Sequence, residues 1–157
     1  MTSFLSTFVN KVDRKGRVSV PAPFRNALAS DSYQGIIAYP SLTEPALDGF
    51  SRAMLEELNQ RELDKTMTEG NFERILLGGG TNILDTIMAM VHELPFDSEG
   101  RIVLPAALAE AAQITDKATF VGRGSRFQIW SPDNIEDHKR SAVATLRSRL
   151  AGPGESS

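Results

Sequence analysis

The 157-residue chain contains no cysteine and only two histidines, His92 and His138. Without thiols, disulfide frameworks, cysteine-ligated zinc, iron–sulfur clusters and cysteine nucleophiles are excluded, and a reducing compartment is permitted. Neither histidine belongs to a His-Glu-x-x-His or similar spacing, so the usual pattern of zinc ligands is missing as well. We therefore expect no metal and no cofactor.

Long hydrophobic runs are missing too. The longest, from Ile83 to Val91, is interrupted by Asp85 and is far shorter than the roughly 20 apolar residues that cross a bilayer. The first residues place charges close behind a short mixed stretch, without the long apolar core of a secretory signal. We expect a cytoplasmic protein that does not bind membranes.

The familiar motifs of catalysis are also absent. The triple glycine Gly78-Gly79-Gly80 lacks the lysine of a phosphate-binding loop, and Gly122-Arg123-Gly124 is a lone G-x-G inside an expected hairpin. No G-x-S-x-G nucleophile elbow occurs. The sequence predicts no catalytic residues, no small-molecule substrate and hence no enzyme.

Charge is unevenly distributed along the chain, although the net charge is only −3. Five basic residues against one acid give residues 11–26 a local charge of +4, whereas eight acids against three bases give residues 44–73 a charge of −5. Such separation is typical of a protein that binds an anion in one orientation. Solvated surface charge is the other explanation.

The chain also repeats itself. Residues 13–25, DRKGRVSVPAPFR, return 84 positions later as residues 97–109, DSEGRIVLPAALA. Aspartate, glycine, arginine, proline and alanine recur at identical offsets, and three further positions stay apolar. Two copies of one supersecondary unit are therefore expected.

Each copy predicts a tight turn, a strand and a short helix. Gly16 and Gly100 suit the positive φ of a hairpin turn, and Asp13 and Asp97 suit hydrogen bonds to the turn backbone. The prolines that follow favour an extended residue before them and can open a helix. The expected strands are 17–20 and 101–104, the expected helices are 22–29 and 106–113, and further β segments are expected at 35–40, 117–121 and 125–130.

The remaining sequence is predicted to be helical. Leu47, Phe50, Met54 and Leu58 fall at helical spacing on one face, which we interpret as a packing face. Further helices are expected at 81–93, after the glycine run, and at 132–150, before a frayed tail. Trp130 is expected to anchor the core.

These features carry a resemblance. The doubled D-x-x-x-R motif, the strings KGRVSVPAPFR and EGRIVLPAAL, and the segment FVGRGSRFQIWSP resemble the MraZ family within the SpoVT-AbrB-like superfamily. The resemblance implies an α+β fold in which two tandem SpoVT-AbrB-like half-barrels form a swapped-hairpin β-barrel, with helices between and after the copies. Gln128 departs from the family, which usually has Glu there. The expected divisions are a first repeat at 7–54, a helical connector at 55–90, a second repeat at 91–134, and a C-terminal helix and tail at 135–157.

The resemblance also implies a function. Its members are sequence-specific transcriptional regulators that form ring-like homo-oligomers and bind short tandem repeats of double-stranded DNA upstream of the bacterial division and cell-wall gene cluster, which would associate the protein with the nucleoid. The alternative is a non-catalytic oligomeric module whose scaffold binds a protein partner, as antitoxin-like relatives of the superfamily also do.

Comparing the copies indicates which one contacts DNA. Copy two replaces three of the four cations of copy one with Ser98, Glu99 and Ala109 but keeps the turn and helix residues. Since phosphates are bound by surface Lys and Arg, and guanine is read by Arg, the DNA-binding residues are expected in copy one. These are Arg14, Lys15, Arg17 and Arg25, whereas Asp13, Asp97 and Arg101 are expected to be structural or secondary DNA contacts.

Overall fold

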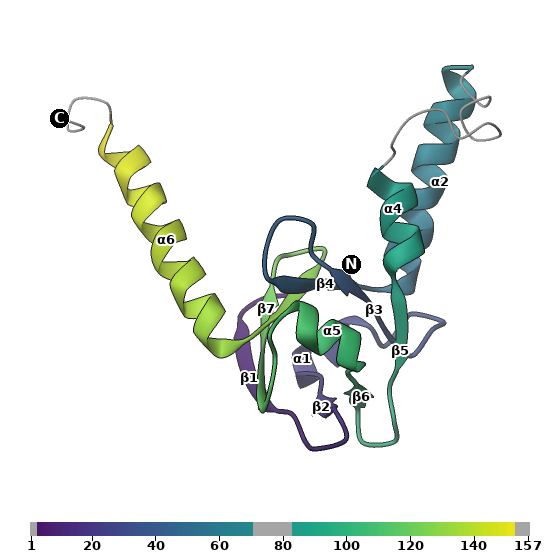
Figure 1. Ribbon diagram of the computed structural model, residues 1–157. Coiled ribbons are helices and arrows are strands. Elements are labelled where there is room, and N and C mark those ends of the chain that lie inside the picture. Colours follow the sequence, from purple (N-terminus) through teal and green to yellow (C-terminus); the bar gives the residue numbers. More distant parts are fainter. Residues whose placement is uncertain (1–2, 71–82, 153–157) are drawn as a thin grey trace.

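The computed structural model describes residues 3–70 and 83–152, which form an α+β fold with antiparallel sheets (Figure 1). The strands are β1 (Thr7–Lys11), β2 (Arg17–Ser19), β3 (Gly35–Pro40), β4 (Ala46–Phe50), β5 (His92–Pro95), β6 (Arg101–Val103), β7 (Lys117–Gly122) and β8 (Phe127–Trp130). The helices of the described ranges are α1 (Ala22–Ala27), α2 (Arg52–Thr68), α4 (Ile83–Met90), α5 (Ala106–Ala111) and α6 (Pro132–Ala151).

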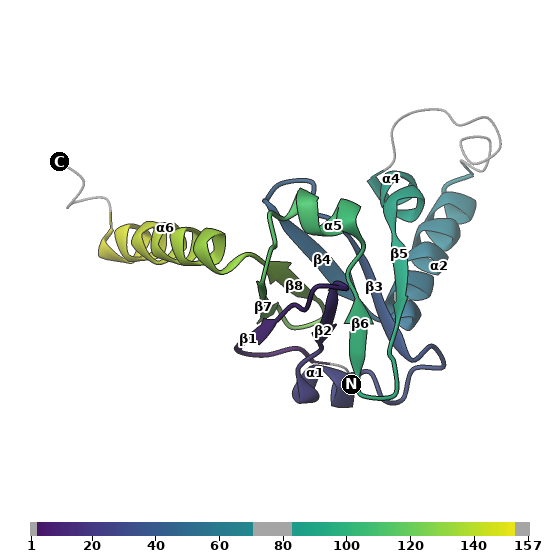
Figure 2. The same cartoon turned by 60° about the horizontal axis from the view of Figure 1, so that its bottom comes forward.

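The two halves of the chain exchange strands. One sheet has the order β1-β7-β8-β4-β3-β5, and a separate ribbon pairs β2 with β6. The first strand of each copy, β1 or β5, pairs with a strand of the other half. Exchanging the halves reverses the strand order onto itself, so an approximate two-fold axis passes between β4 and β8. Figure 2 shows β2 and β6 side by side near this axis.

The turns hold the halves together through reciprocal backbone hydrogen bonds. Gly16 and Gly100 have φ values of +80° and +76°, which glycine adopts without strain. Leu104 N–H donates to the Gly16 carbonyl at 2.7 Å, and Val20 N–H donates to the Gly100 carbonyl at 3.2 Å. Each copy's turn therefore closes onto the strand end of the other copy.

The main core lies between the six-stranded sheet, the ribbon and the two short helices. Phe24 of α1 packs edge-on against Phe4, with ring centroids 5.3 Å apart, and Leu108 of α5 is buried in the same cluster. Val18 and Ile102 point inward from the ribbon and are 1% exposed. Burial of this shared apolar surface is the main stabilisation that holds the halves together.

A buried polar group joins the halves where β4 pairs with β8. Gln128, 1% exposed, donates an amide N–H to Asp48 at 2.9 Å and accepts the indole N–H of Trp130 at 3.1 Å. A glutamate at this position would place a second carboxylate against Asp48, whereas the glutamine amide supplies a donor. Burial and the Asp48 carboxylate raise the pKa of Tyr39 to about 12.

Two helical projections extend from the β-rich body. Figure 1 shows α6 on one side and the α2–α4 pair on the other, while the turns of both hairpins lie at the opposite end. Side chains cap two of these helices, because the Ser51 hydroxyl accepts the Met54 N–H and the Ser131 hydroxyl accepts the Asn134 N–H. Within the described ranges, none of the helices combines the length and apolar character that a bilayer crossing requires.

Most expected elements are confirmed, with ends shifted by a few residues. The turns, the strand after each turn, the helices after Pro21 and Pro105, and the C-terminal helix are present, and Trp130 is 1% exposed. The helical stripe from Leu47 to Leu58 is wrong, because Leu47 and Phe50 lie in β4 and α2 begins at Arg52. Spacings of three residues fit a helix, but β4 is buried on both faces and so lacks the alternation of a half-exposed strand.

The helix expected at 81–93 is partly wrong. Its described part, α4, ends at Met90, and His92 and Glu93 belong to β5, where they pair with β3. Gly78-Gly79-Gly80, the start of this helix at 81–82 and the tail from residue 153 lie outside the described residues.

Gly16→Ala should destabilise the protein more than Gly124→Ala. Both glycines have φ near +80°, which costs an L-residue about 1–2 kcal/mol. An added Cβ at Gly16 would also lie 2.9 Å from the Leu104 carbonyl oxygen. At Gly124, an added Cβ would have no heavy atom of another described residue within 4 Å, apart from its chain neighbours. Urea denaturation of both variants measures the difference. Equal losses would contradict the role of the turn in joining the halves.

Candidate nucleic-acid interface

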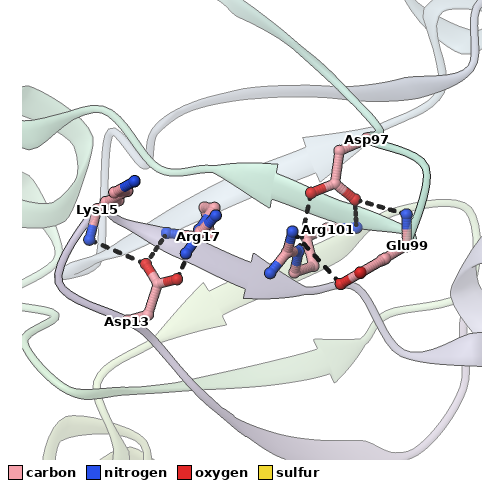
Figure 3. Close-up of polar contacts among 6 residues, drawn as sticks. All are labelled: Asp13, Lys15, Arg17, Asp97, Glu99 and Arg101. Carbon is pink, nitrogen blue, oxygen red and sulfur yellow. Dashed lines mark hydrogen bonds and ion pairs between the residues drawn. The ribbon is translucent and has the colours of Figure 1, made fainter.

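The same polar turn is built in both copies (Figure 3). One oxygen of Asp13 accepts the backbone N–H groups of Lys15 and Arg17, each at 2.9 Å, and its other oxygen accepts Arg17 Nε at 2.6 Å. The matching oxygens of Asp97 accept Glu99 N–H, Arg101 N–H and Arg101 Nε at 2.9, 2.9 and 2.8 Å. Asp13, Asp97 and both arginines therefore have an architectural role.

These contacts perturb the pKa values of the turn residues. The backbone hydrogen bond from Arg17 lowers the pKa of Asp13 most, and the guanidinium of Arg17 adds to the effect. Arg101 has the same effect on the pKa of Asp97. The hydrogen bond to Asp97 in turn raises the pKa of Arg101. Both carboxyl groups are thus ionised at neutral pH.

The ribbon of β2 and β6 presents one polar face outward. Arg17 is directly opposite Val103, and Ser19 is directly opposite Arg101. Because Val18 and Ile102 point into the core, these four residues share the outer face. A two-stranded ribbon of this kind fits the major groove of B-DNA.

The two arginines of the ribbon differ in their remaining contacts. Arg101 Nη2 also pairs with the Glu99 carboxylate at 3.3 Å. Lys15 occupies the matching position in copy one, and the Nη groups of Arg17 have no ion-pair partner among the described residues. The side chain of Arg17 is 35% exposed and that of Arg101 is 28% exposed. Arg17 therefore keeps a free hydrogen-bonding edge that Arg101 shares with an acid.

The structure brings three of the four expected DNA-binding residues together. Arg14 and Lys15 are exposed on the turn that also positions Arg17. Arg25 lies elsewhere, because its Nε donates to the Val20 carbonyl at 3.0 Å and its guanidinium covers Gly100 of the other turn. A Cβ at Gly100 would lie 2.6 Å from Arg25 Nη1. Arg25 thus packs against the copy-two turn.

The matching place beside the copy-one turn is open. Copy two has Ala109 in place of Arg25, so no long side chain covers Gly16. A hollow of about 300 Å³ remains there. Its lining includes Asp13, Arg14, Lys15, Ala109 and Thr115.

Two features of this face escaped the sequence analysis. Glu99 was recognised as the replacement of Lys15, but its ion pair with Arg101 was not predicted. Val103, 55% exposed at the position that matches Ser19, was also missed as an apolar residue on the outer face of the ribbon. Aligning the copies and following the two-residue alternation from buried Ile102 would have identified it. The described ranges contain no cluster of three or more potential metal ligands.

The turn carboxylates should make stability depend on pH in acid. Because folding lowers the pKa of Asp97, its stabilising effect is complete above the ordinary value of 3.8 and is lost as pH falls through the lowered value. Asp97→Asn should therefore melt below the wild type at pH 7, and the two melting temperatures should converge toward pH 3.

Thermal unfolding between pH 3 and pH 7 measures this convergence. Glu136→Gln, which removes an exposed carboxylate on α6, controls for the loss of one negative charge. A gap between wild type and Asp97→Asn that does not change with pH would contradict the assignment.

The sequence was compared with protein-family models and with known proteins, and both comparisons found matches. Residues 87–148 match the family model described as "MraZ protein, putative antitoxin-like". The chain is 40% identical over 146 residues to the Transcriptional regulator MraZ of Rickettsia bellii (strain OSU 85-389), covering 90% of both chains. It is 38% identical over 148 residues to that of Xanthobacter autotrophicus (strain ATCC BAA-1158 / Py2), covering 94% of this chain and 88% of the relative. The chain belongs to the MraZ family.

Proposed function

We propose that the protein is a non-catalytic, sequence-specific DNA-binding transcriptional regulator. Its sites would be short direct repeats of double-stranded DNA upstream of the bacterial division and cell-wall gene cluster, and the protein would act in the cytoplasm at the nucleoid. The proposal includes a swapped-hairpin barrel made from the two repeats. The exchanged pairing of β1 and β5 supports that architecture.

The asymmetry of an otherwise two-fold scaffold carries this proposal. Both copies build the same turn with the same hydrogen bonds, so the turn does not require Arg14 or Lys15. Copy one nevertheless has Arg14 and Lys15 exposed where copy two has Ser98 and Glu99. Surface cations that the fold does not require, on a ribbon that fits a groove, are the features expected of a DNA-binding face.

Arg17 is the best candidate to read a base. Asp13 holds its Nε, which fixes the guanidinium plane and leaves the Nη edge for the O6 and N7 atoms of a guanine. Arg14 and Lys15, on the tip of the same turn, would contact backbone phosphates. Val103 adds an apolar side chain beside Arg17, and such side chains can contact the methyl group of thymine.

The alternative function is an oligomeric module that binds a protein partner. Such a module does not need its cations concentrated on one turn. The salt dependence of binding separates the two functions, because each phosphate contact steepens the log–log slope by about 0.9. Binding to the upstream region of its own operon with no salt dependence would favour the protein-binding module.

We also propose that copies assemble head-to-tail into a homo-oligomer, in the form of a ring. Opposite charges on the two projections support this arrangement. Beyond His138, α6 carries four bases and no acid, whereas the described residues 52–69 and 83–90 hold six acids and three bases. Both projections also expose apolar side chains, among them Leu146 and Leu150 on α6 and Met67 and Ile83 on the α2–α4 pair.

Arg17→Ala should weaken binding to the repeats by about 1–3 kcal/mol and relax the preference for one base pair. Arg101→Ala removes the matching arginine of copy two and serves as the control. It should lower stability more than affinity, because Glu99 already occupies its Nη2 group. Fluorescence anisotropy and thermal unfolding measure the two effects. Equal affinity losses in folded variants would refute the assignment of copy one.

Head-to-tail assembly predicts a strict spacing of the DNA sites. Successive copies present the same face in the same direction, so direct repeats about one helical turn apart would be contacted together. Inserting about 5 base pairs between two repeats should lower affinity toward that of a single repeat, while inserting about 10 should be tolerated better. Unchanged affinity after the half-turn insertion, or equal binding of an inverted repeat, would exclude the head-to-tail arrangement.

A further inference from the structure

We propose that Lys11 and Lys117 form a second phosphate-binding site, built by both halves of the chain, beside the copy-one turn. This inference rests on the proposed DNA-binding function and extends it to a residue of the second half. Lys117 lies 92 positions beyond Arg25, the last basic residue of the positively charged stretch 11–26. The exchange of strands between the halves brings Lys117 beside the copy-one turn.

The register of the sheet places the two lysines directly opposite each other. β1 pairs antiparallel with β7, and the last residue of β1, Lys11, is the partner of the first residue of β7, Lys117. Both side chains are exposed and lie on the same side of the sheet, since the partners of a register pair share a face. Their Cβ atoms are therefore about 5 Å apart.

Like charges in this arrangement destabilise a sheet. Neither lysine forms an ion pair with any residue that the structure describes. Of the two nearest acids along the chain, Asp13 pairs with Arg17, and Asp116, whose carboxylate accepts the hydroxyl of Thr115, forms no ion pair with either lysine among the described residues. A repulsive pair that no carboxylate of the described residues bridges is suited to an external anion that lies between the two ammonium groups.

The pair lies beside the turn that carries the proposed DNA-binding residues, on the sheet face that points away from the main core. Val12, next to Lys11, donates its N–H to the carbonyl of Asp116, next to Lys117, at 2.8 Å. Thr115 lines the same hollow as Arg14 and Lys15. The lysine pair therefore lies at the base of the turn whose tip carries the other two cations, which allows one DNA backbone to contact both.

The other half of the molecule provides an internal comparison. At the matching place β3 pairs with β5, and the residues opposite each other are Gly35 and Pro95. Because one of these two equivalent places holds a lysine pair and the other an uncharged pair, the fold does not require charge there. As with Lys15 and Glu99, the extra positive charge lies beside the copy-one turn, although Lys117 belongs to the second half of the chain.

Salt titration of the full-length chain tests the site. Anisotropy would compare the wild type with Lys11→Gln, Lys117→Gln and the double variant, on a duplex with the direct repeats and on an unrelated duplex of equal length. Arg126→Gln, which removes an exposed cation of the turn between β7 and β8, is the control for the loss of one positive charge. Lys117→Arg keeps the charge and tests for rescue.

We expect the double variant to bind both duplexes about fivefold more weakly at 0.15 M salt and to lower the salt slope by about 0.9. One phosphate contact changes the logarithm of the binding constant with a slope of about 0.9 against the logarithm of the salt concentration, which between about 0.15 M and 1 M amounts to about fivefold in affinity. Lys117→Arg should bind like the wild type. In the absence of DNA, Lys117→Gln should have a melting temperature no lower than that of the wild type, because the repulsion between Lys11 and Lys117 has been removed.

The possible failures can be distinguished. A wild type that binds neither duplex in a salt-dependent way would refute the proposed function itself. A wild type that binds, with a double variant indistinguishable from Arg126→Gln, would refute the lysine site alone. A Lys117→Arg variant that binds as weakly as Lys117→Gln would also overturn the site, because its loss would then come from packing instead of charge.

Discussion

The pairing of β2 with β6 is the constraint on which the rest of the structure depends. Each strand has three residues, so neither has enough contacts to persist alone. Pairing buries Val18 and Ile102 against the common core and lets each turn hydrogen-bond the strand end of the other copy. The outer positions of the ribbon then follow from strand alternation. Fold and candidate interface therefore have one origin, since the contact that closes the core also presents Arg17 and Arg101 to solvent.

Identical scaffolds with different side chains separate what the fold requires from what function adds. Aspartate and arginine are kept in both copies because they stabilise the turn through three hydrogen bonds each. Lys15 and Glu99 occupy equivalent positions with opposite charges, and the backbone tolerates both. The acid in copy two draws Arg101 toward the protein, whereas Arg17 keeps its outer edge unpaired among the described residues. The residue at this one turn position thus decides whether the Nη edge of the arginine is held by an acid or left open.

The backbone hydrogen bonds of each turn could be predicted from the sequence, and interactions between copies could not. The turn is local, so Asp13, Gly16 and Arg17 indicate its hydrogen bonds by their types and spacing. β4 was taken for part of a helix because its pairing with β8 is long-range and both its faces are buried. The position of Arg25 over Gly100 depends on how the halves meet. The register of Lys11 with Lys117 likewise follows only once the exchange of β1 is known.

Fusing the two repeats in one chain is what permits this asymmetry. In a homodimer of a single repeat, every residue occurs twice, so a basic turn would be accompanied by a second basic turn across the two-fold axis. Here one turn became basic while its partner kept only the residues that the fold needs. Each chain therefore offers one cationic face, and the affinity of one such face for DNA is limited by the few phosphates it can reach. In the proposed function, several chains on several repeats would compensate for this limit, because each contact after the first would be made at a high effective concentration.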